Sequence, residues 1–239
     1  MIFIPVYNPN NEIIKIVIKL IKIYKFKSSE IFIINDNSDE GYEKFFSNLE
    51  KIGCVIKKNK GVRGKGSAIK YAINLAIVNK FEFILIADGD GQHLPEDILQ
   101  IYKIGKKEQN FIIGERNFSH APYINKLSNY FSTYLFNKIT NQNLIDTQCG
   151  LRFIHKKHFK YLNNLKETKF DYELVMLFEL NKLKFKIVNL KINTVYFKQK
   201  YNTKFNKIFD TIYIIKVFLI YRFFKNKFTE VTNQNRSDG

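Results

Sequence analysis

The feature that most constrains the fold is an apolar run, residues 83–87, that ends at two closely spaced aspartates. The run reads Phe-Ile-Leu-Ile-Ala and contains no charge, which is typical of a strand buried on both faces of a parallel sheet. Asp88 and Asp90 follow it, separated by Gly89, so both carboxylates leave the carboxyl end of the strand. Because ligands of open α/β sheets bind at that edge, the pattern predicts a ligand site there.

The two carboxylates of this stretch are suited to a divalent cation. Mg²⁺ and Mn²⁺ prefer oxygen ligands and usually share them with substrate phosphates. Gly89 has no side chain, so the backbone can bend and direct both carboxylates to one point. Gln92 and His93 add polar groups nearby. The alternative is a turn whose aspartates only cap the helix that begins near Pro95, but one aspartate would suffice for a cap. We therefore favour a metal site.

Three further strands are predicted upstream of this site. Residues 1–6, 31–34 and 54–57 are short apolar runs, and a helical pattern of apolar residues follows the first and the third of them. Alternation of strands and helices is typical of a parallel sheet with right-handed crossovers. We therefore expect an α/β fold with a Rossmann-like, predominantly parallel central sheet flanked by helices. Its strands should end in polar loops at one edge.

Two of these polar loops are candidates for contacts with a nucleotide. The second strand ends in residues 35–39, where Asp36 could accept hydrogen bonds from a nucleobase or ribose, or could belong to an Asx-rich turn. Residues 59–67, with Lys65 among their glycines and cations, precede a helix and resemble a phosphate cradle. This loop matches neither a P-loop nor the Rossmann glycine pattern. Glycines that serve only the turns of the loop are the alternative.

Downstream of the two aspartates, the strongest signals are two strands and two helices. Residues 111–113 read as a strand that leads to Arg116, whose guanidinium could pair bidentately with a phosphate or form a surface salt bridge. Residues 123–139 have helical periodicity, which fits core packing or a flap over the site. Arg152 opens another strand, and residues 170–173 open a further helix.

Charge and cysteine content bound the class of protein. The 239 residues are enough for one large domain, and their formal net charge is +17. Such a charge points to an anionic partner: nucleic acid, a lipid-phosphate surface or a phosphorylated substrate. Cys54 and Cys149 are far apart and read as reduced thiols of a cytosolic protein. We expect no signal peptide, because no basic region precedes the first apolar run, and no membrane span.

Several of these segments, taken in order, resemble the motifs of family-two glycosyltransferases. The motifs are Pro5-Val6-Tyr7-Asn8, Asn35-Asp36-Asn37-Ser38, Gly64-Lys65-Gly66, Asp88-Gly89-Asp90-Gly91-Gln92-His93, Gly114-Glu115-Arg116 and Asp146-Thr147-Gln148-Cys149-Gly150-Leu151-Arg152. The last two are similar to the polyprenyl-phosphate branch, which includes dolichyl-phosphate mannosyl- and glucosyltransferases. The resemblance covers roughly residues 1–205. It implies a GT-A fold, a nucleotide-sugar donor, a divalent metal (Mg²⁺ or Mn²⁺) and inversion at the anomeric carbon.

The resemblance also implies roles for individual residues on the donor side. The residues that would bind the nucleotide sugar are Pro5, Tyr7, Asn8, Asp36, Lys65 and Asp88. The metal would be held by Asp88 and Asp90, with Gln92 as a further ligand. Asn37 stands where the family commonly has glycine, and asparagine tolerates the left-handed backbone conformation that a tight turn needs.

On the acceptor side, the resemblance places Asp146 where an inverting transferase keeps a base. A lipid phosphate is already ionised, however, so Asp146 would then serve mainly to orient it. Stabilisation of the leaving diphosphate by the metal and Arg116 would be the larger effect. Arg152 and Glu173 match family positions assigned to the acceptor side, and helix capping is the alternative for Glu173.

The end of the chain changes character after the expected catalytic domain, residues 1–205. Within that domain, residues 193–205 are basic enough to close over phosphates. Residues 206–228 combine apolar side chains with cations, which suits an amphipathic helix at a membrane interface; docking on the protein's own sheet fits equally well. Residues 229–239 are polar, and we expect them to be disordered.

We therefore expect an inverting, metal-dependent glycosyltransferase that moves a sugar from a nucleotide-sugar donor to a polyprenyl phosphate, such as undecaprenyl or dolichyl phosphate. It would act peripherally at the cytoplasmic face of the cell membrane, in cell-envelope biogenesis. A transferase that extends a cell-surface polysaccharide or glycolipid is the second hypothesis. A nucleic-acid-binding protein is the third, but it leaves the paired aspartates unexplained and no binding module supports it.

Overall fold

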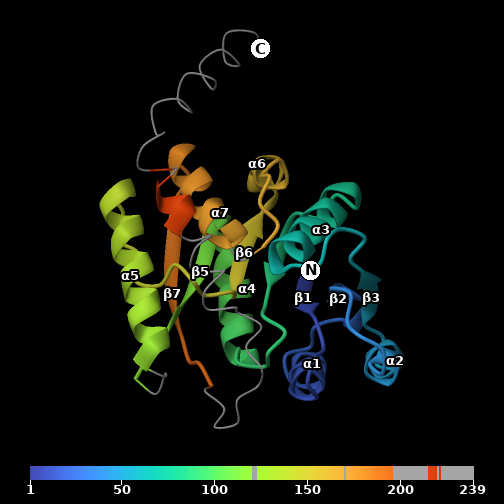
Figure 1. Ribbon diagram of the computed structural model, residues 1–239. Helices are drawn as coiled ribbons and strands as arrows, with labels where there is room; N and C mark the ends of the chain where they lie inside the picture. Colours follow the sequence, from blue (N-terminus) through green and yellow to red (C-terminus); the bar gives the residue numbers. More distant parts are fainter. Residues whose placement is uncertain (120–122, 170, 196–214, 220, 222–239) are drawn as a thin grey trace.

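The apolar runs form the centre of a seven-stranded sheet in a computed structural model of the chain (Figure 1). The structure describes residues 1–119, 123–169, 171–195, 215–219 and 221. The strands are β1 (Ile2–Val6), β2 (Ile31–Asn35), β3 (Val55–Lys58), β4 (Phe83–Ile86), β5 (Phe111–Arg116), β6 (Arg152–His155) and β7 (Ile187–Ile192). The helices are α1 (Glu12–Lys22), α2 (Glu43–Lys51), α3 (Lys65–Val78), α4 (Pro95–Glu108), α5 (Tyr123–Thr140), α6 (Phe159–Asn163) and α7 (Asp171–Lys182).

The sheet is parallel except for one strand. Its order is β3-β2-β1-β4-β6-β5-β7, and β6 is antiparallel to both β4 and β5. Phe83 of β4 pairs with His155 at the far end of the antiparallel β6, whereas Phe111 of β5 pairs with Ile187, the first residue of the parallel β7. The predicted predominantly parallel α/β sheet is confirmed. The reversed direction of β6 is not evident from its sequence pattern.

The strands are buried because helices cover both faces of the sheet. Helices α1, α2 and α4 pack on one face, and α3, α6 and α7 pack on the other (Figure 1). Aromatic rings fill the core between them: Phe3 stacks on Phe32 with ring centroids 4.7 Å apart, and Phe83 stacks on Phe153 at 5.0 Å. Burying one such side chain contributes roughly 1.5–3 kcal/mol. Gly105 of α4 lies directly over the Phe153 ring, where a side chain would collide, so the helix can approach the sheet closely.

One edge of the sheet collects the polar segments. Since β4 and β5 are both antiparallel to β6, they are parallel to each other, and every strand except β6 ends at the same edge. The loops after β1, β2, β3, β4 and β5 therefore meet there. Residues 146–151, which lead into β6, reach this edge from the opposite direction. We call it the carboxyl edge, and it carries the candidate site.

Two predicted helices are confirmed close to their expected bounds. Helix α4 begins at Pro95 and has Glu96 and Asp97 in its first turn, where the helix dipole stabilises carboxylates. Helix α5 covers Tyr123–Thr140, one residue beyond the predicted range. No helix within the described part of the chain is long and apolar enough to cross a bilayer.

Only a part of the predicted C-terminal helix lies among the described residues. Residues 215–219 and 221 are helical, with Val217 and Phe218 buried. Tyr221 stacks on Phe178 of α7 with ring centroids 4.1 Å apart. This part packs on helix α7, and the choice between a membrane interface and the protein's own sheet for residues 206–228 stays a prediction. Residues 196–205, the rest of 206–228 and the predicted disordered tail 229–239 lie outside the described residues.

Candidate active site

Strand β4 delivers both aspartates to the carboxyl edge, as predicted. Ala87 is still buried, and Asp88 and Asp90 follow it with partly exposed side chains. Gly89 packs against the Pro5 carbonyl oxygen at the end of β1, where a side chain would collide. The φ angle of Gly89 does not lie in the left-handed region. Glycine is therefore needed here for space, which corrects the bending of the backbone inferred from the sequence.

Asp88 lies between a cation and a glycine. Lys65 Nζ, at the start of α3, is 2.7 Å from Asp88 Oδ1 and 2.8 Å from Glu173 Oε2 of α7. On the other side, Gly150 packs directly against the Asp88 carboxylate. Burial disfavours the Asp88 charge, but Lys65 and His93 outweigh it and hold the pKa of Asp88 well below its usual range. The two carboxylates likewise overcome the burial of Lys65 and raise its pKa, so Asp88 and Lys65 are both ionised at neutral pH.

Asp90 is in a different electrostatic situation from Asp88. Its Oδ1 accepts a hydrogen bond from the Gln92 amide at 2.9 Å, and its backbone carbonyl accepts one from Asn10 Nδ2 at 3.1 Å. Burial and the neighbouring charge of Asp88 raise the pKa of Asp90. A cation placed between the two carboxylates would relieve this repulsion and favour the ionised form of Asp90.

The residues present fit a divalent cation as a partial set of oxygen ligands. Asp88 and Asp90 supply carboxylates, and the partly exposed Gln92 is the predicted further ligand. His93 Nε2 lies 3.4 Å from Asp88 Oδ2. Among the described residues, no group of three or more His, Cys, Asp and Glu side chains is arranged to hold a metal. Two adjacent carboxylates fit Mg²⁺ or Mn²⁺, which bind through one or two carboxylates and complete their coordination with substrate phosphates and water.

Arg116, at the end of β5, forms a second charged cluster with Asp146. Arg116 Nε donates to Asp146 Oδ2 at 2.7 Å, and Nη2 donates to Oδ1 at 3.1 Å. The backbone amide of Arg116 reaches Oδ2 at 3.2 Å, and that of Gln148 reaches Oδ1 at 2.9 Å. The Asp146 side chain is fully buried, whereas Arg116 is 20% exposed. Asp146 therefore orients Arg116 at the carboxyl edge, and each of its oxygens accepts two hydrogen bonds.

The segment from Asp146 to Arg152 connects the two clusters. Its first residue is paired with Arg116, and Gly150, near its end, abuts the carboxylate of Asp88. Arg152 then begins β6 inside the sheet. The motif that resembles the acceptor side of the family is thus also the structural link between the two aspartates and the arginine.

Arg152 and Glu173 both have internal partners, which differs from the expectation that they contact the acceptor. Arg152 is fully buried, and its guanidinium donates to the backbone carbonyls of Glu173 (2.7 Å), Cys149 (2.9 Å) and Thr147 (3.3 Å). These carbonyls hold the guanidinium at the start of β6, which lies between β4 and β5. Glu173 is buried beside Lys65 and neutralises it. We therefore assign both residues to positioning.

Asp36, at the end of β2, holds the glycine-rich loop in place. Asn59 Nδ2 donates to Asp36 Oδ1 at 2.7 Å, and the Gly64 amide donates to Oδ2 at 2.9 Å. Asn59 Nδ2 also lies 3.1 Å from Ser67 Oγ. These contacts fix the start of α3, where Lys65 stands. Asp36 is nearly fully buried, and its direct contact with a nucleoside stays a prediction.

The residues after β1 form a network with the loop after β2. Tyr7 Oη donates to the Asp39 carboxylate at 3.1 Å, and Asn8 Nδ2 donates to Asp39 Oδ2 at 2.6 Å. Arg63 Nη1 donates to Tyr7 Oη at 2.9 Å, and its guanidinium lies 4.7 Å from the centre of the Tyr7 ring. Asn8 and Asn37 are both left-handed, with φ of 46° and 57°, as predicted for Asn37. The network holds Tyr7 and Asn8 at the predicted nucleoside side.

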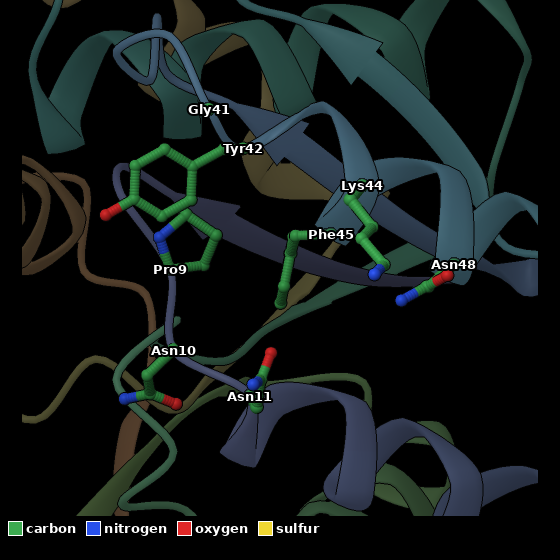
Figure 2. A pocket seen from close by; sticks show the side chains of 8 residues that line it. All are labelled: Pro9, Asn10, Asn11, Gly41, Tyr42, Lys44, Phe45 and Asn48. Carbon is green, nitrogen blue, oxygen red and sulfur yellow. The ribbon is translucent and has the colours of Figure 1, made fainter.

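A surface pocket of about 550 Å³ opens beside this network, where α1 and α2 begin (Figure 2). It is lined by Pro9, Asn10, Asn11, Gly41, Tyr42, Lys44, Phe45 and Asn48. Asn10 connects the pocket to the Asp90 carbonyl through the hydrogen bond described above. None of the predicted site residues lines it. The pocket is therefore a polar neighbour of the candidate site and not its centre.

Three residues that support the site carried no distinct signal in the sequence: Asp39, Asn59 and Asn189. Asn189 of β7 accepts a hydrogen bond from the Ile145 amide at 2.6 Å and donates to the Asp146 carbonyl at 3.2 Å. Asp39 and Asn59 stand in polar loops that were already candidates. Asn189 is the uncharged polar residue of β7, which otherwise contains apolar residues and Lys191, and a polar residue in such a strand is a weak signal that could have revealed it.

A sequence-family model described as glycosyl transferase family 2 matches residues 1–162. A UDP-N-acetylglucosamine–dolichyl-phosphate N-acetylglucosaminyltransferase of Methanococcus voltae is 24% identical over 220 residues, which cover 82% of this chain and 85% of the relative. An uncharacterized protein of Methanocaldococcus jannaschii is 28% identical over 168 residues, which cover 66% of this chain and 72% of the relative.

Solved structures of glucosyl-3-phosphoglycerate synthase from Mycobacterium tuberculosis are similar in fold. The complex with Mn²⁺, uridine diphosphate and glucosyl-3-phosphoglycerate has a TM-score of 0.64 and 11% identity, and the match covers 92% of this chain and 78% of that one. The complex with Mn²⁺ and UDP-glucose has a TM-score of 0.63 at the same identity. At this identity the likeness establishes the fold alone.

Proposed function

The chain belongs to glycosyl transferase family 2, and from this premise we propose that it moves a sugar from a nucleotide-sugar donor to a polyprenyl phosphate. The glycosyltransferase has the GT-A type of fold. We further propose that transfer inverts the anomeric carbon, depends on a divalent metal and takes place at the cytoplasmic face of a membrane, where the protein binds peripherally.

The end of β4 supports the donor side of this proposal. Asp88, Asp90 and Gln92 would hold Mg²⁺ or Mn²⁺, which when bound would neutralise charge on the departing diphosphate. The M. tuberculosis enzyme was crystallised with Mn²⁺ and uridine diphosphate, and the M. voltae relative is named for a UDP-sugar. A UDP-sugar is therefore the first donor to test.

The cations of this chain would act on the phosphates from two directions. Arg116, oriented by Asp146, presents a planar guanidinium that suits bidentate contact with a phosphate. Lys65 stands in the first turn of α3, where the helix dipole also favours anions. Tyr7 and Asn8, held by Asp39, would bind the nucleoside at the far end of the donor.

The buried, bidentate pairing of Asp146 is the observation that carries the choice of acceptor. Its oxygens accept hydrogen bonds from Arg116 and Gln148, so the carboxylate is not arranged to take a proton from an attacking hydroxyl. The oxygen of a lipid phosphate is already charged and needs no such base. The name of the M. voltae relative, which includes dolichyl phosphate, supports the same acceptor class.

The test is a transfer assay with a panel of labelled nucleotide sugars and three acceptors in parallel. The acceptors are a polyprenyl phosphate in detergent, a free oligosaccharide and phosphoglycerate, a phosphorylated hydroxyl acceptor. We expect a sugar product on the polyprenyl phosphate only. Product on the oligosaccharide alone would favour the polysaccharide-extending hypothesis, and product on phosphoglycerate alone would also contradict the proposed acceptor.

A further inference from the structure

Helix α5 buries three polar residues beside Phe136 on its inner face, and it exposes several large apolar residues on its outer face. Asn129, Ser132 and Thr133 are buried, and Thr133 Oγ1 lies 3.0 Å from Thr147 Oγ1. Polar contacts thus attach the inner face of the helix to the segment that follows Asp146. An ordinary surface helix turns its apolar residues toward the core. Helix α5 does so with Phe136, but it also carries large apolar residues on its outer face.

The outward face of α5 carries a stripe of large apolar side chains. The stripe consists of Tyr123, Leu127, Tyr130, Phe131 and Tyr134, and we call it the α5 stripe. Its members recur at helical spacing and therefore lie on one side of the helix. Their exposed fractions range from 50% for Tyr134 to 79% for Tyr123. Figure 1 shows α5 at the outside of the molecule, next to β7 and α7. A contiguous exposed stripe of this kind marks an interaction surface.

The charges of α5 indicate what the stripe binds. The helix contains Lys126 and Lys138 and no acidic residue. Lys138 Nζ lies 5.8 Å from the ring centre of Tyr134, so positive charge borders the stripe directly. Two copies of the chain joined through this face would bring four lysines together without a carboxylate from either helix. An anionic bilayer would attract the same lysines.

The three tyrosines favour the same partner. A tyrosine ring with its hydroxyl at the tip is suited to the boundary between acyl chains and headgroups, where one end is apolar and the other is hydrated. We propose that the α5 stripe docks the enzyme on an anionic lipid bilayer, with Lys126 and Lys138 at the level of the headgroups. The choice of a bilayer rests on the proposed lipid acceptor, whereas the surface itself is inferred from α5 alone.

Docking through this stripe would also place the site correctly for such an acceptor. The inner face of α5 contacts Thr147, the neighbour of Asp146, which is paired with Arg116. An α-helix with its side chains is about 10–12 Å across. The arginine would then lie roughly one helix width from the headgroup layer, where the phosphate of a membrane-embedded acceptor is found.

The experiment compares vesicle binding of two matched double variants of the full chain. Leu127→Gln with Phe131→Gln removes apolar area from the stripe. Ile23→Gln with Val78→Gln removes comparable apolar side chains, 59% and 70% exposed, from the residue after α1 and from the end of α3. Co-sedimentation uses vesicles of phosphatidylcholine mixed with phosphatidylglycerol, and vesicles of phosphatidylcholine alone. Circular dichroism and thermal unfolding establish that both variants are folded.

We expect the stripe variant to bind the anionic vesicles at least ~10-fold more weakly than wild type, because interfacial binding scales with buried apolar area. The control variant should bind like wild type, and neutral vesicles should bind the wild type weakly. Unchanged vesicle binding by the stripe variant would overturn the proposal. So would a wild-type dimer that becomes monomeric in the variant, by analytical ultracentrifugation, when neither protein binds vesicles.

Transfer to a polyprenyl phosphate in detergent separates this proposal from the proposed function. A stripe variant that loses vesicle binding but keeps transfer in detergent supports both. Loss of vesicle binding together with the absence of any lipid-phosphate transfer by wild type would support the surface and contradict the acceptor.

Discussion

The Asp146–Arg116 cluster and the Asp88–Asp90 cluster both lie at the carboxyl edge, but their acids are compensated to different degrees. Asp146 is fully buried, and each of its oxygens accepts two hydrogen bonds. At the end of β4, Lys65 compensates Asp88, while Asp90 accepts one backbone hydrogen bond on its carboxylate and has a raised pKa.

This difference suggests different roles for the two clusters: Asp146 positions Arg116, whereas Asp88 and Asp90 are suited to binding a cation. A carboxylate that is already satisfied keeps Arg116 in one orientation. A carboxylate beside a like charge is destabilised, and a bound cation relieves that repulsion. The relief strengthens the binding of a substrate that brings or shares the cation. The first cluster should therefore be insensitive to metal, and the second should depend on it.

Asp90→Asn should produce the largest change. We expect activity to fall by at least ~100-fold, the scale of losing a principal charge stabiliser, while the fold is retained. Chelation of divalent cations should have the same effect on wild type. Transfer assays with and without chelator measure this, and full turnover by the variant would contradict the metal assignment.

Asp146→Asn should have a smaller effect on the rate, about 10-fold, because the change disturbs the orientation of Arg116 and removes no base that a lipid phosphate needs. The residual activity should depend little on pH between neutral and mildly basic conditions. Thermal stability should decrease, since the guanidinium loses its counter-charge. Nearly complete loss of activity that recovers as pH rises would instead indicate a hydroxyl acceptor.

Metal-linked stability distinguishes the two clusters without an activity assay. Free Mn²⁺ at ten times its Kd should stabilise wild type by about 1.4 kcal/mol, because it binds the folded protein and not the unfolded chain. Asp90→Asn should lose this stabilisation, and Asp146→Asn should keep it. In the absence of metal, Asp90→Asn should unfold at a higher temperature than wild type at neutral pH, because the variant no longer holds two neighbouring negative charges. Differential scanning calorimetry measures both effects.

Asp97 is a further acid to compare with Asp88 and Asp90. It lies in the first turn of α4, just after the loop that carries them. Burial raises its pKa to about 6, although the Asn193 amide donates to it at 2.9 Å. The folded protein therefore holds this proton more tightly than the unfolded chain does. Its contribution to stability is present below about pH 4, the ordinary range of an aspartate, and is lost as the pH rises through about 6.

Asp97→Asn should accordingly be the smallest of the four effects. Relative to wild type, it should raise the free energy of unfolding at pH 8 by on the order of 1 kcal/mol and leave it unchanged at pH 4. Urea unfolding at the two pH values measures this. An equal effect at both pH values would show that the change acts through packing and not through the charge.

The parts of the site that follow parallel strands could be predicted from the sequence. An uncharged apolar run that ends in aspartates encodes both the burial of β4 and the position of Asp88 and Asp90, so a local pattern suffices. The loops before α2 and α3 were found in the same way, whereas the roles of Tyr7 and Asn8 were implied by the family resemblance. Helix α5 was found from its period, although the period alone does not say that the α5 stripe is exposed.

The pairings across the sheet could not be predicted in this way. Arg116 meets Asp146 because β5 and the segment before β6 are neighbours in space, and no local pattern states that β6 runs backward. The sequence indicates that Arg152 opens a strand, and the resemblance places it on the acceptor side, but neither says that its side chain is buried. Its burial follows from the central position of β6 between β4 and β5, which is a property of the topology.

The reversed strand β6 also bears on the order in which the molecule is assembled. Strands β1 to β4 can pair as soon as the first part of the chain has been synthesised, and they bring together the donor loops and both aspartates. Strand β6 lies between β4 and β5, and its pairing with both strands brings Gly150 against Asp88 and Asp146 against Arg116. Contacts between distant parts of a chain form slowly because a long loop must close first. In the nascent protein the loops of the donor side would thus form early, and the site would be complete only after β6 has paired with β4 and β5.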